Sequence, residues 1–234
     1  MKKWIAMFVV VVCFFIANTS DVSAKSKGTI CIDPGHQRHQ NLGTEPIAPG
    51  SSIRKTKVSS GTAGVVTKKP EYQLTLELGL KLKKSLKKKG YKVCMTRTKN
   101  NVNITNVQRA TYCNQKKADL TVRIHADGST NRATQGLTVL YPSNSKTKAI
   151  NKKSKKTAKV MMKQLIKKTK AKKGYGTGLM ARNDLSGFNW SKTPVVLVEV
   201  GFMSNPTEDR KLSKKSYQRK LVSGMVRGIQ KTVK

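Results

Sequence analysis

The sequence has few acidic and few aromatic residues, and both shortages limit what the protein can bind. There are 11 Asp and Glu against 48 Lys and Arg, which gives a formal net charge of +37. Such an excess predicts adhesion to polyanions. Only 6% of the residues are aromatic, so few side chains can stack on bases, and no recognisable nucleic-acid-binding motif accompanies the charge. We therefore do not expect a nucleic-acid partner.

Cysteines are also scarce. One of the four, Cys13, lies near the N-terminus, which leaves Cys31, Cys94 and Cys113 in the rest of the chain. An odd number excludes a complete disulfide framework, and the absence of a CxxC pair argues against a cysteine-based zinc site. Cys31 and Cys94 fall in predicted strands, where a free cysteine commonly packs as a small apolar residue. We expect free thiols, with a Cys31–Cys94 bridge as the alternative in an exported protein.

Long hydrophobic runs are missing except at the N-terminus. Two lysines precede an apolar stretch at 5–17, and small residues at 22–24 end it. This layout is typical of a secretory signal, and the stretch is short for a membrane span of about 18 or more residues. We expect residues 1–24 to be a signal peptide cleaved after Ala24, so that the protein is secreted. The alternative is an uncleaved N-terminal anchor.

Residues 25–234 alternate between apolar runs and helical patterns and contain no evident repeat. This alternation predicts a single α/β domain, in which a twisted, mostly parallel β-sheet is covered by helices on both faces. Segment 37–69 is rich in Gly, Ser and Thr and is expected to be a long loop insertion. The shorter segment 177–189 is also expected to be a loop. Strands are expected at 29–32, 91–96, 120–124, 136–141 and 195–199, and helices at 70–90, 104–116 (capped by Asn103), 151–172 and around 217–229.

Three of the predicted strands end in a polar residue that could take part in chemistry. His36 follows the first strand, His125 closes the run at 120–124, and Glu199 closes the run at 195–198. Side chains at the carboxyl edge of a mostly parallel sheet point into the crevice where α/β proteins bind ligands. The three residues together indicate a functional site at this edge.

Glu71 opens the predicted helix at 70–90 and shares a face with Leu74, Leu78 and Leu82. An inward carboxylate is costly unless it is paired or binds a metal. The alternative is a first-turn glutamate that faces solvent, where the helix dipole also favours it, and geometry alone leaves the two interpretations equal. With His36 and His125, an inward Glu71 completes a common ligand trio of catalytic zinc. Glu199 could then act as general acid or base.

Two further residues near His36 have less specific roles. Asp33 could orient His36 through a hydrogen bond or cap the turn at Pro34–Gly35, and we weight these roles equally. His39 is expected to be exposed rather than to bind metal. The sequence contains no GxSxG and no phosphate-binding P-loop.

At these positions the chain resembles the zinc-dependent N-acetylmuramoyl-L-alanine amidases of bacterial cell-wall turnover, spore lysis and phage lysis. The resemblance extends from about residue 28 to the C-terminus. The segments that carry it are IDPGH at 32–36, Glu71 with the GYKVCMTR at 90–97, Arg109-Ala110 with the ADLTVRIHA at 118–126, and the PVVLVEVGFMSNP at 194–206.

The resemblance implies one Zn²⁺ ion held by His36, Glu71 and His125, with Glu199 as the catalytic acid/base. The implied reaction is hydrolysis of the peptidoglycan amide between N-acetylmuramic acid and L-alanine. Many members have glycines and a short loop after the first histidine, where this chain has Gln37-Arg38-His39 and the 37–69 insertion. Many also have Asn where this chain has Asp127. These departures bear on substrate preference and access to the cleft.

A non-catalytic, strongly basic cell-wall-binding protein is the competing hypothesis, and the presence of all four site residues argues against it. We expect a monomer that binds peptidoglycan and anionic cell-wall polymers, without a stable membrane anchor after signal cleavage. Because the sequence leaves no residues for a separate wall-binding domain, we expect the lysine-rich surface to take its place.

Overall fold

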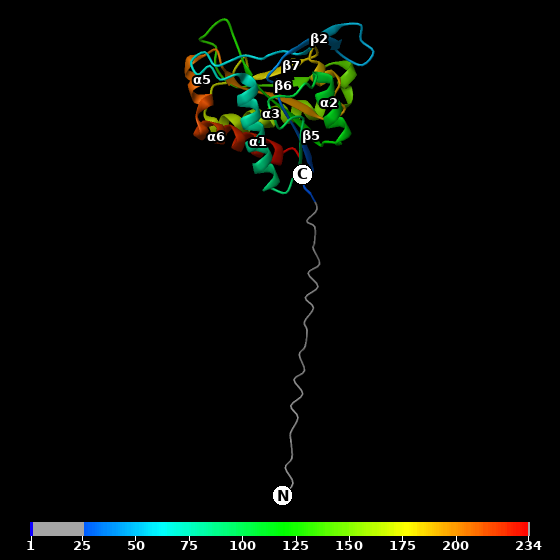
Figure 1. Ribbon diagram of the computed structural model, residues 1–234, viewed down its shortest axis with the longest axis vertical. Coiled ribbons are helices and arrows are strands. Elements are labelled where there is room, and N and C mark those ends of the chain that lie inside the picture. The colour runs from blue at the N-terminus through cyan, green and yellow to red at the C-terminus, as the bar shows by residue number, and fades with distance from the viewer. Residues whose placement is uncertain (2–25, 234) are drawn as a thin grey trace.

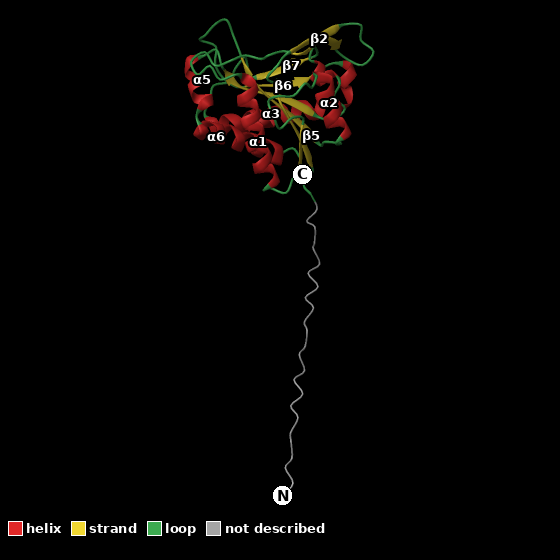
Figure 2. Cartoon of the chain, in the orientation of Figure 1, coloured by secondary structure: helices red, strands yellow, loops and turns green. Residues whose placement is uncertain are grey.

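A six-stranded sheet forms the centre of the molecule (Figures 1 and 2). The computed structural model describes Met1 and residues 26–233, so the predicted signal peptide lies, apart from Met1, outside the described residues. The strand order is β4-β1-β5-β8-β6-β7. The strands are β1 (Thr29–Pro34), β4 (Lys92–Met95), β5 (Leu120–Asp127), β6 (Thr138–Pro142), β7 (Leu179–Arg182) and β8 (Val195–Phe202).

The sheet is mostly parallel, as the sequence predicts. β1, β4, β5 and β8 run in the same direction, whereas β6 pairs antiparallel with β8, and β7 runs parallel to β6. The chain leaves β1 for one neighbour, β4, and then crosses to the other neighbour, β5. Ligands bind at such a switch point in open α/β sheets, and the carboxyl ends of β1 and β5 meet there.

Helices cover both faces of the sheet, which confirms the predicted α/β domain. On one face, α1 (Glu71–Lys87), α3 (Lys148–Thr169) and α6 (Lys215–Gln230) enclose the main apolar core against strand residues such as Ile32, Val122 and Val198. On the other face lie α2 (Asn106–Gln115) and the short α4 (Ser186–Asn189). A 3₁₀ turn, Ser145–Thr147, precedes α3, and α5 (Pro206–Ser213) connects β8 to α6. Among the described residues, no helix has the length and apolarity needed to cross a membrane.

The leucine stripe of α1 lies against the sheet, as predicted. Leu74, Leu78, Leu82 and Leu86 are at most 1% exposed, and burial of each contributes about 1.5–3 kcal/mol relative to an exposed position. Pro70 stands at the N-cap of α1, where its missing N–H removes no helical hydrogen bond. The stripe therefore fixes the rotation of α1 and turns Glu71 towards the sheet.

Both segments predicted as loops contain secondary structure. Segment 37–69 includes a two-stranded hairpin of β2 (Asn41–Pro46) and β3 (Arg54–Val58), and segment 177–189 includes β7 and α4. The hairpin buries little apolar surface, and Leu42 and Ile53 are more than 60% exposed, so it lacks the alternation that identifies a half-buried strand. The helix predicted after Asn103 is capped instead by Thr105, in a capping box with Gln108.

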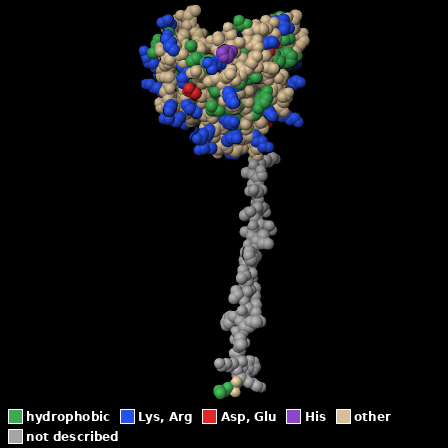
Figure 3. All heavy atoms as spheres, viewed as in Figure 1, with side chains coloured by type: hydrophobic (Ala, Val, Ile, Leu, Met, Phe, Trp, Pro, Cys, Tyr) green, Lys and Arg blue, Asp and Glu red, His purple; other side chains and the backbone are tan. Residues whose placement is uncertain are grey.

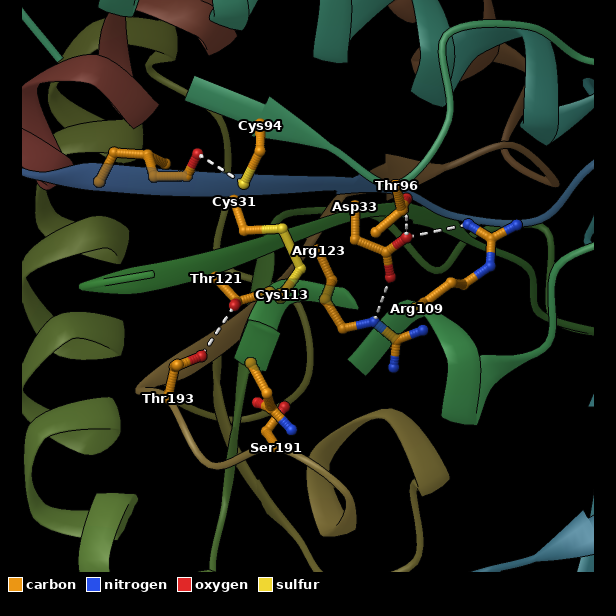
Figure 4. Close-up of a disulfide and its surroundings, with 12 residues drawn as sticks. Cys31, Asp33, Cys94, Thr96, Arg109, Cys113, Thr121, Arg123, Ser191 and Thr193 are labelled. Carbon is orange, nitrogen blue, oxygen red and sulfur yellow. Dashed lines mark hydrogen bonds and ion pairs between the residues drawn. A yellow bond between two sulfur atoms is a disulfide. The ribbon is translucent and has the colours of Figure 1, made fainter. Parts of the chain in front are cut away.

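The expectation of free thiols holds for Cys94 and is wrong for Cys31 and Cys113, and the alternative Cys31–Cys94 bridge is also wrong. Cys31 in β1 forms a disulfide with Cys113 in α2 (Figure 4). Cys94 lies beside Cys31 on β4, and its thiol donates to the carbonyl of Ile30. The three cysteines form one cluster on the face covered by α2, and the helix brings Cys113 within bonding distance of Cys31. The sequence separation of 82 residues gave no local signal for this pairing.

Removal of the disulfide should destabilise the fold. In a Cys31→Ala/Cys113→Ala double variant, we expect the free energy of unfolding to fall by about 2–5 kcal/mol, because the bridge closes a long loop in the unfolded chain. Urea unfolding followed by circular dichroism measures this change. A Cys94→Ala variant is the control and should unfold near the wild-type midpoint. Equal midpoints for the double variant and the wild type would contradict the expectation.

Candidate active site

The ends of β1 and β5 and the start of α1 bring His36, Glu71 and His125 together. The Glu71 Oε1 atom lies 3.2 Å from His36 Nε2 and 3.1 Å from His125 Nδ1, and the two nitrogens are 3.2 Å apart. Glu71 is 2% exposed. The side chain therefore faces inward, and the three residues predicted from the sequence meet at one point.

The donor set and its spacing fit a zinc ion. Tetrahedral ligands at about 2.0–2.1 Å from zinc are separated by roughly 3.3 Å, close to the three distances in this cluster. Burial lowers the pKa of His125 to about 4, so this imidazole is neutral at pH 7, as a metal ligand must be. Burial favours the neutral acid at Glu71, but the charge and hydrogen bonds of the two histidines outweigh it and hold the pKa of Glu71 well below its usual range. Burial lowers the pKa of His36, but the charge and hydrogen bond of Glu71 outweigh it and raise this pKa, so His36 must release its proton when it binds a metal.

Backbone groups orient the proposed ligands. The Nδ1 atom of His36 lies 2.9 Å from the carbonyl of Ser59, a bond that fixes the tautomer and leaves the Nε2 lone pair free for metal. The Glu71 carboxylate accepts N–H bonds from Thr62 at Oε2 and from Ala126 at Oε1. Ser59 and Thr62 belong to the segment predicted as a loop insertion, so part of this insertion supports the site directly.

Two buried arginines hold the backbone of the loop that carries His36. Arg97 donates to the carbonyls of Pro34 and Gly35, at 3.0 and 2.9 Å. Arg109 donates to the carbonyls of Pro34 and His36, at 2.8 and 2.9 Å. His36 has a φ of +56°, a left-handed conformation that is uncommon for non-glycine residues and persists only where surrounding contacts enforce it. The two guanidinium groups supply those contacts.

Asp33 has neither of its predicted roles. Its carboxylate binds Arg109 Nη1 at 2.9 Å, Arg123 Nε at 2.8 Å and the hydroxyl of Thr96 at 2.6 Å (Figure 4). The two arginines outweigh the effect of burial and hold the pKa of Asp33 well below its usual range. Asp33 therefore acts on His36 only indirectly, because it fixes the guanidinium group of Arg109.

Glu199 lies beside the cluster on β8, in register with His125 on β5. A cleft of about 230 Å³ is lined by both residues and by His36, Arg123 and Arg182. The Oε2 atom of Glu199 is buried without a hydrogen-bond partner. Burial, together with the charges of Glu71 and Asp127, raises the pKa of Glu199 well above its usual range. A carboxyl with a raised pKa suits proton exchange, and this one lies beside a cleft where it can exchange a proton with a bound group.

His39 is exposed and lies outside the cluster, in agreement with the prediction. Gly35 is a supporting residue that sequence reasoning did not single out as part of the site. A Cβ atom at this position would overlap the imidazole ring of His125. The only signal was its place beside His36 in the IDPGH segment.

A sequence profile of the Amidase_3 family, described as N-acetylmuramoyl-L-alanine amidase, matches residues 30–231. The chain belongs to this family. The match confirms the resemblance identified from the sequence, and the protein is an N-acetylmuramoyl-L-alanine amidase.

Individual amidases are similar along nearly the whole chain. An N-acetylmuramoyl-L-alanine amidase of Mycobacterium tuberculosis is 29% identical over 220 residues, which cover 92% of this chain and 90% of that protein. The solved structure of the amidase Ami1 from Mycobacterium smegmatis has a TM-score of 0.80 and 28% identity, and the match covers 88% of this chain and 97% of that one. Ami1 from Mycobacterium abscessus gives a TM-score of 0.81 at 28% identity, covering 88% and 99%.

A methyl group at Gly35 should impair metal binding by the amidase. In a Gly35→Ala variant the His125 ring must move, and we expect zinc affinity to fall at least about tenfold, as it does when the orientation of a ligand is disturbed. Competition with a chromogenic chelator measures the affinity. Gly43→Ala, on the exposed hairpin, is the matched control and should bind zinc as the wild type does. Wild-type affinity in Gly35→Ala would contradict this role of Gly35.

Proposed function

We propose that this amidase is a secreted zinc hydrolase that cleaves the amide between N-acetylmuramic acid and the L-alanine of the stem peptide in peptidoglycan. His36, Glu71 and His125 would hold the zinc ion, and Glu199 would act as the acid/base. The convergence of these three ligand atoms beside a carboxyl group whose buried Oε2 atom has no hydrogen-bond partner carries the proposal.

Each side chain has a defined part in this chemistry. A zinc ion in the site supplies Lewis acidity, which can lower the pKa of a water molecule towards about 7. Glu199 accepts a proton at its free Oε2 atom from the attacking water and returns it to the amide nitrogen as the carbon–nitrogen bond breaks. His36 and Glu71 keep their geometry through their bonds to the backbone of Ser59, Thr62 and Ala126. The products are a free lactyl carboxylate and a peptide with an alanine amino terminus.

Secretion is part of the proposal and rests on residues 1–24, whose charged start, apolar centre and small C-terminal residues are typical of a signal peptide. Peptidoglycan lies outside the cytoplasmic membrane, so an enzyme that acts on it is expected there. The charge of +37 favours retention on anionic wall polymers.

Mass spectrometry of digested peptidoglycan tests the proposed reaction, because it reports which bond is cut. We expect stem peptides with a free L-alanine amino terminus, and we expect a chelator to stop their release and added zinc to restore it. Cleavage of a glycosidic or peptide–peptide bond would refute the assignment. Binding to peptidoglycan without any release would favour the non-catalytic wall-binding hypothesis.

A further inference from the structure

A groove of about 480 Å³ runs between α1 and α6, which lie side by side on one face of the sheet (Figure 1). It shares no lining residue with the cleft at Glu199. The walls carry five cationic side chains and the base includes two valines. The lining residues are Lys81, Lys84, Ser85, Lys89, Lys215, Arg219, Val222, Ser223 and Val226.

The cations of the groove have little local compensation. Glu77 is the nearby carboxylate, and it already binds Lys69 at 2.6 Å and accepts a bond from Gln218. α6 contains no acidic residue at all. The side chains of Lys84, Lys215 and Arg219 are exposed, as is that of Lys89. These four cations are therefore free to contact an anion.

Lys81 lies deeper than the others and is held in place. Its ammonium group binds the side-chain oxygen of Gln218, which is itself 1% exposed. Burial, with the neighbouring charges of Lys215 and Arg219, lowers the pKa of Lys81 despite the opposite effect of Glu77. The groove thus gathers positive charges that repel one another, and a bound anion would relieve this repulsion.

We propose that this groove binds a phosphodiester-linked polyol chain, an anionic polymer that has a charge at each repeat and no bases. The repeated phosphates match cations contributed by two adjacent helices. The valines at the base suit the methylene groups of the polyol. The lining has no aromatic side chain on which a base could stack, and its five cations favour a chain with repeated charges over an uncharged lipid acyl chain.

The groove is well separated from the amidase site. Glu71 begins α1, and ten residues at a rise of about 1.5 Å place Lys81 roughly 15 Å further along the helix. A polymer in the groove would therefore leave the cleft open, so that one molecule could hold the polymer and cleave its substrate at the same time.

Lys and Arg side chains are spread over the face that Figure 3 shows, so the test must separate this groove from general charge. The groove variant is Lys84→Gln/Lys89→Gln/Lys215→Gln/Arg219→Gln. The control variant is Lys152→Gln/Lys155→Gln/Lys156→Gln/Lys159→Gln, which removes the same charge from exposed positions on α3. Both are made in the full chain, and circular dichroism confirms their folding.

Binding of purified poly(glycerol phosphate) is measured by titration calorimetry at several salt concentrations. We expect the groove variant to bind about 10²-fold more weakly or worse. Each lost cation removes one favourable contact with a phosphate of the polymer. Its slope of log K against log salt should shrink by roughly 3, given 0.7–0.9 per phosphate contact on nucleic acids. The control variant should change far less. Cleavage of a small soluble muramoyl-peptide should be unaffected in both, so this test is independent of the proposed reaction.

Equal weakening in the two variants would overturn the proposal, because it would show adhesion to charge in general. The choice of occupant would be overturned by a different ligand, either a single-stranded oligonucleotide or an anionic vesicle. Such a ligand would have to bind more tightly than the polymer and lose its binding in the groove variant alone. Loss of polymer binding confined to the groove variant, with weaker binding of both alternatives, would support it.

Discussion

Replacement of Glu199 by Gln should lower kcat by about 10³-fold, within the range attributed to a positioned acid/base group. Gln has the size and shape of Glu, but it cannot accept a proton from water and return it to the leaving nitrogen. The side chain lies beside His125 in the cleft, and one of its oxygens has no partner to lose. We therefore expect the fold and the zinc content to remain those of the wild type. Steady-state hydrolysis of a muramoyl-peptide, with metal analysis of the same sample, measures both.

Asp127→Asn is the matched control for this experiment, since Asp127 lies at the same edge of the sheet and is half-buried. Many members of the family have Asn there, so we expect kcat to change only a few-fold. A Glu199→Gln enzyme that retains nearly full activity would show that another group transfers the proton.

Replacement of His36 by Ala should abolish metal binding and, with it, hydrolysis. Within residues 26–233, the imidazole supplies one of the three converging ligand atoms. We expect zinc affinity to fall by more than the about 10–100-fold that loss of an outer hydrogen-bond partner costs. The zinc-to-protein ratio after dialysis against a weak chelator should drop towards zero, while release of stem peptides falls to background.

His39→Ala provides a close control, because His39 is three residues away, exposed and outside the cluster. It should retain one zinc ion per chain and full activity. If His36→Ala kept its zinc, or if His39→Ala lost it, the assignment of the ligands would be wrong.

The site residues could be predicted because they occupy positions that local patterns define. Runs of β-branched residues place His125 and Glu199 at strand ends, and parallel strands end at the same edge of a sheet. The leucine stripe of α1 fixes the helix rotation and hence the inward direction of Glu71. In each case a few neighbouring residues contain the information.

The partners of those residues could not be predicted in the same way. Arg97 and Arg109 lie in segments that carry the family resemblance, but they bind loop carbonyls more than 60 residues away in sequence, and no local pattern predicts those partners. Cys113 has the same difficulty, since its pairing with Cys31 depends on how α2 lies on the sheet. The β2–β3 hairpin escaped prediction because it buries too little apolar surface to leave a pattern. Local patterns identify which residues face the site, whereas tertiary packing determines what holds them.

The arginine contacts to the His36 loop also bear on whether the fold of this loop depends on metal binding. Three consecutive carbonyls, those of Pro34, Gly35 and His36, are fixed by guanidinium groups from outside the loop. Protein contacts thus hold the left-handed turn at His36. Small zinc domains unfold without metal because binding and folding are one equilibrium. If this amidase holds zinc as proposed, we expect the two equilibria to be separate, so that removal of metal yields an inactive but folded enzyme.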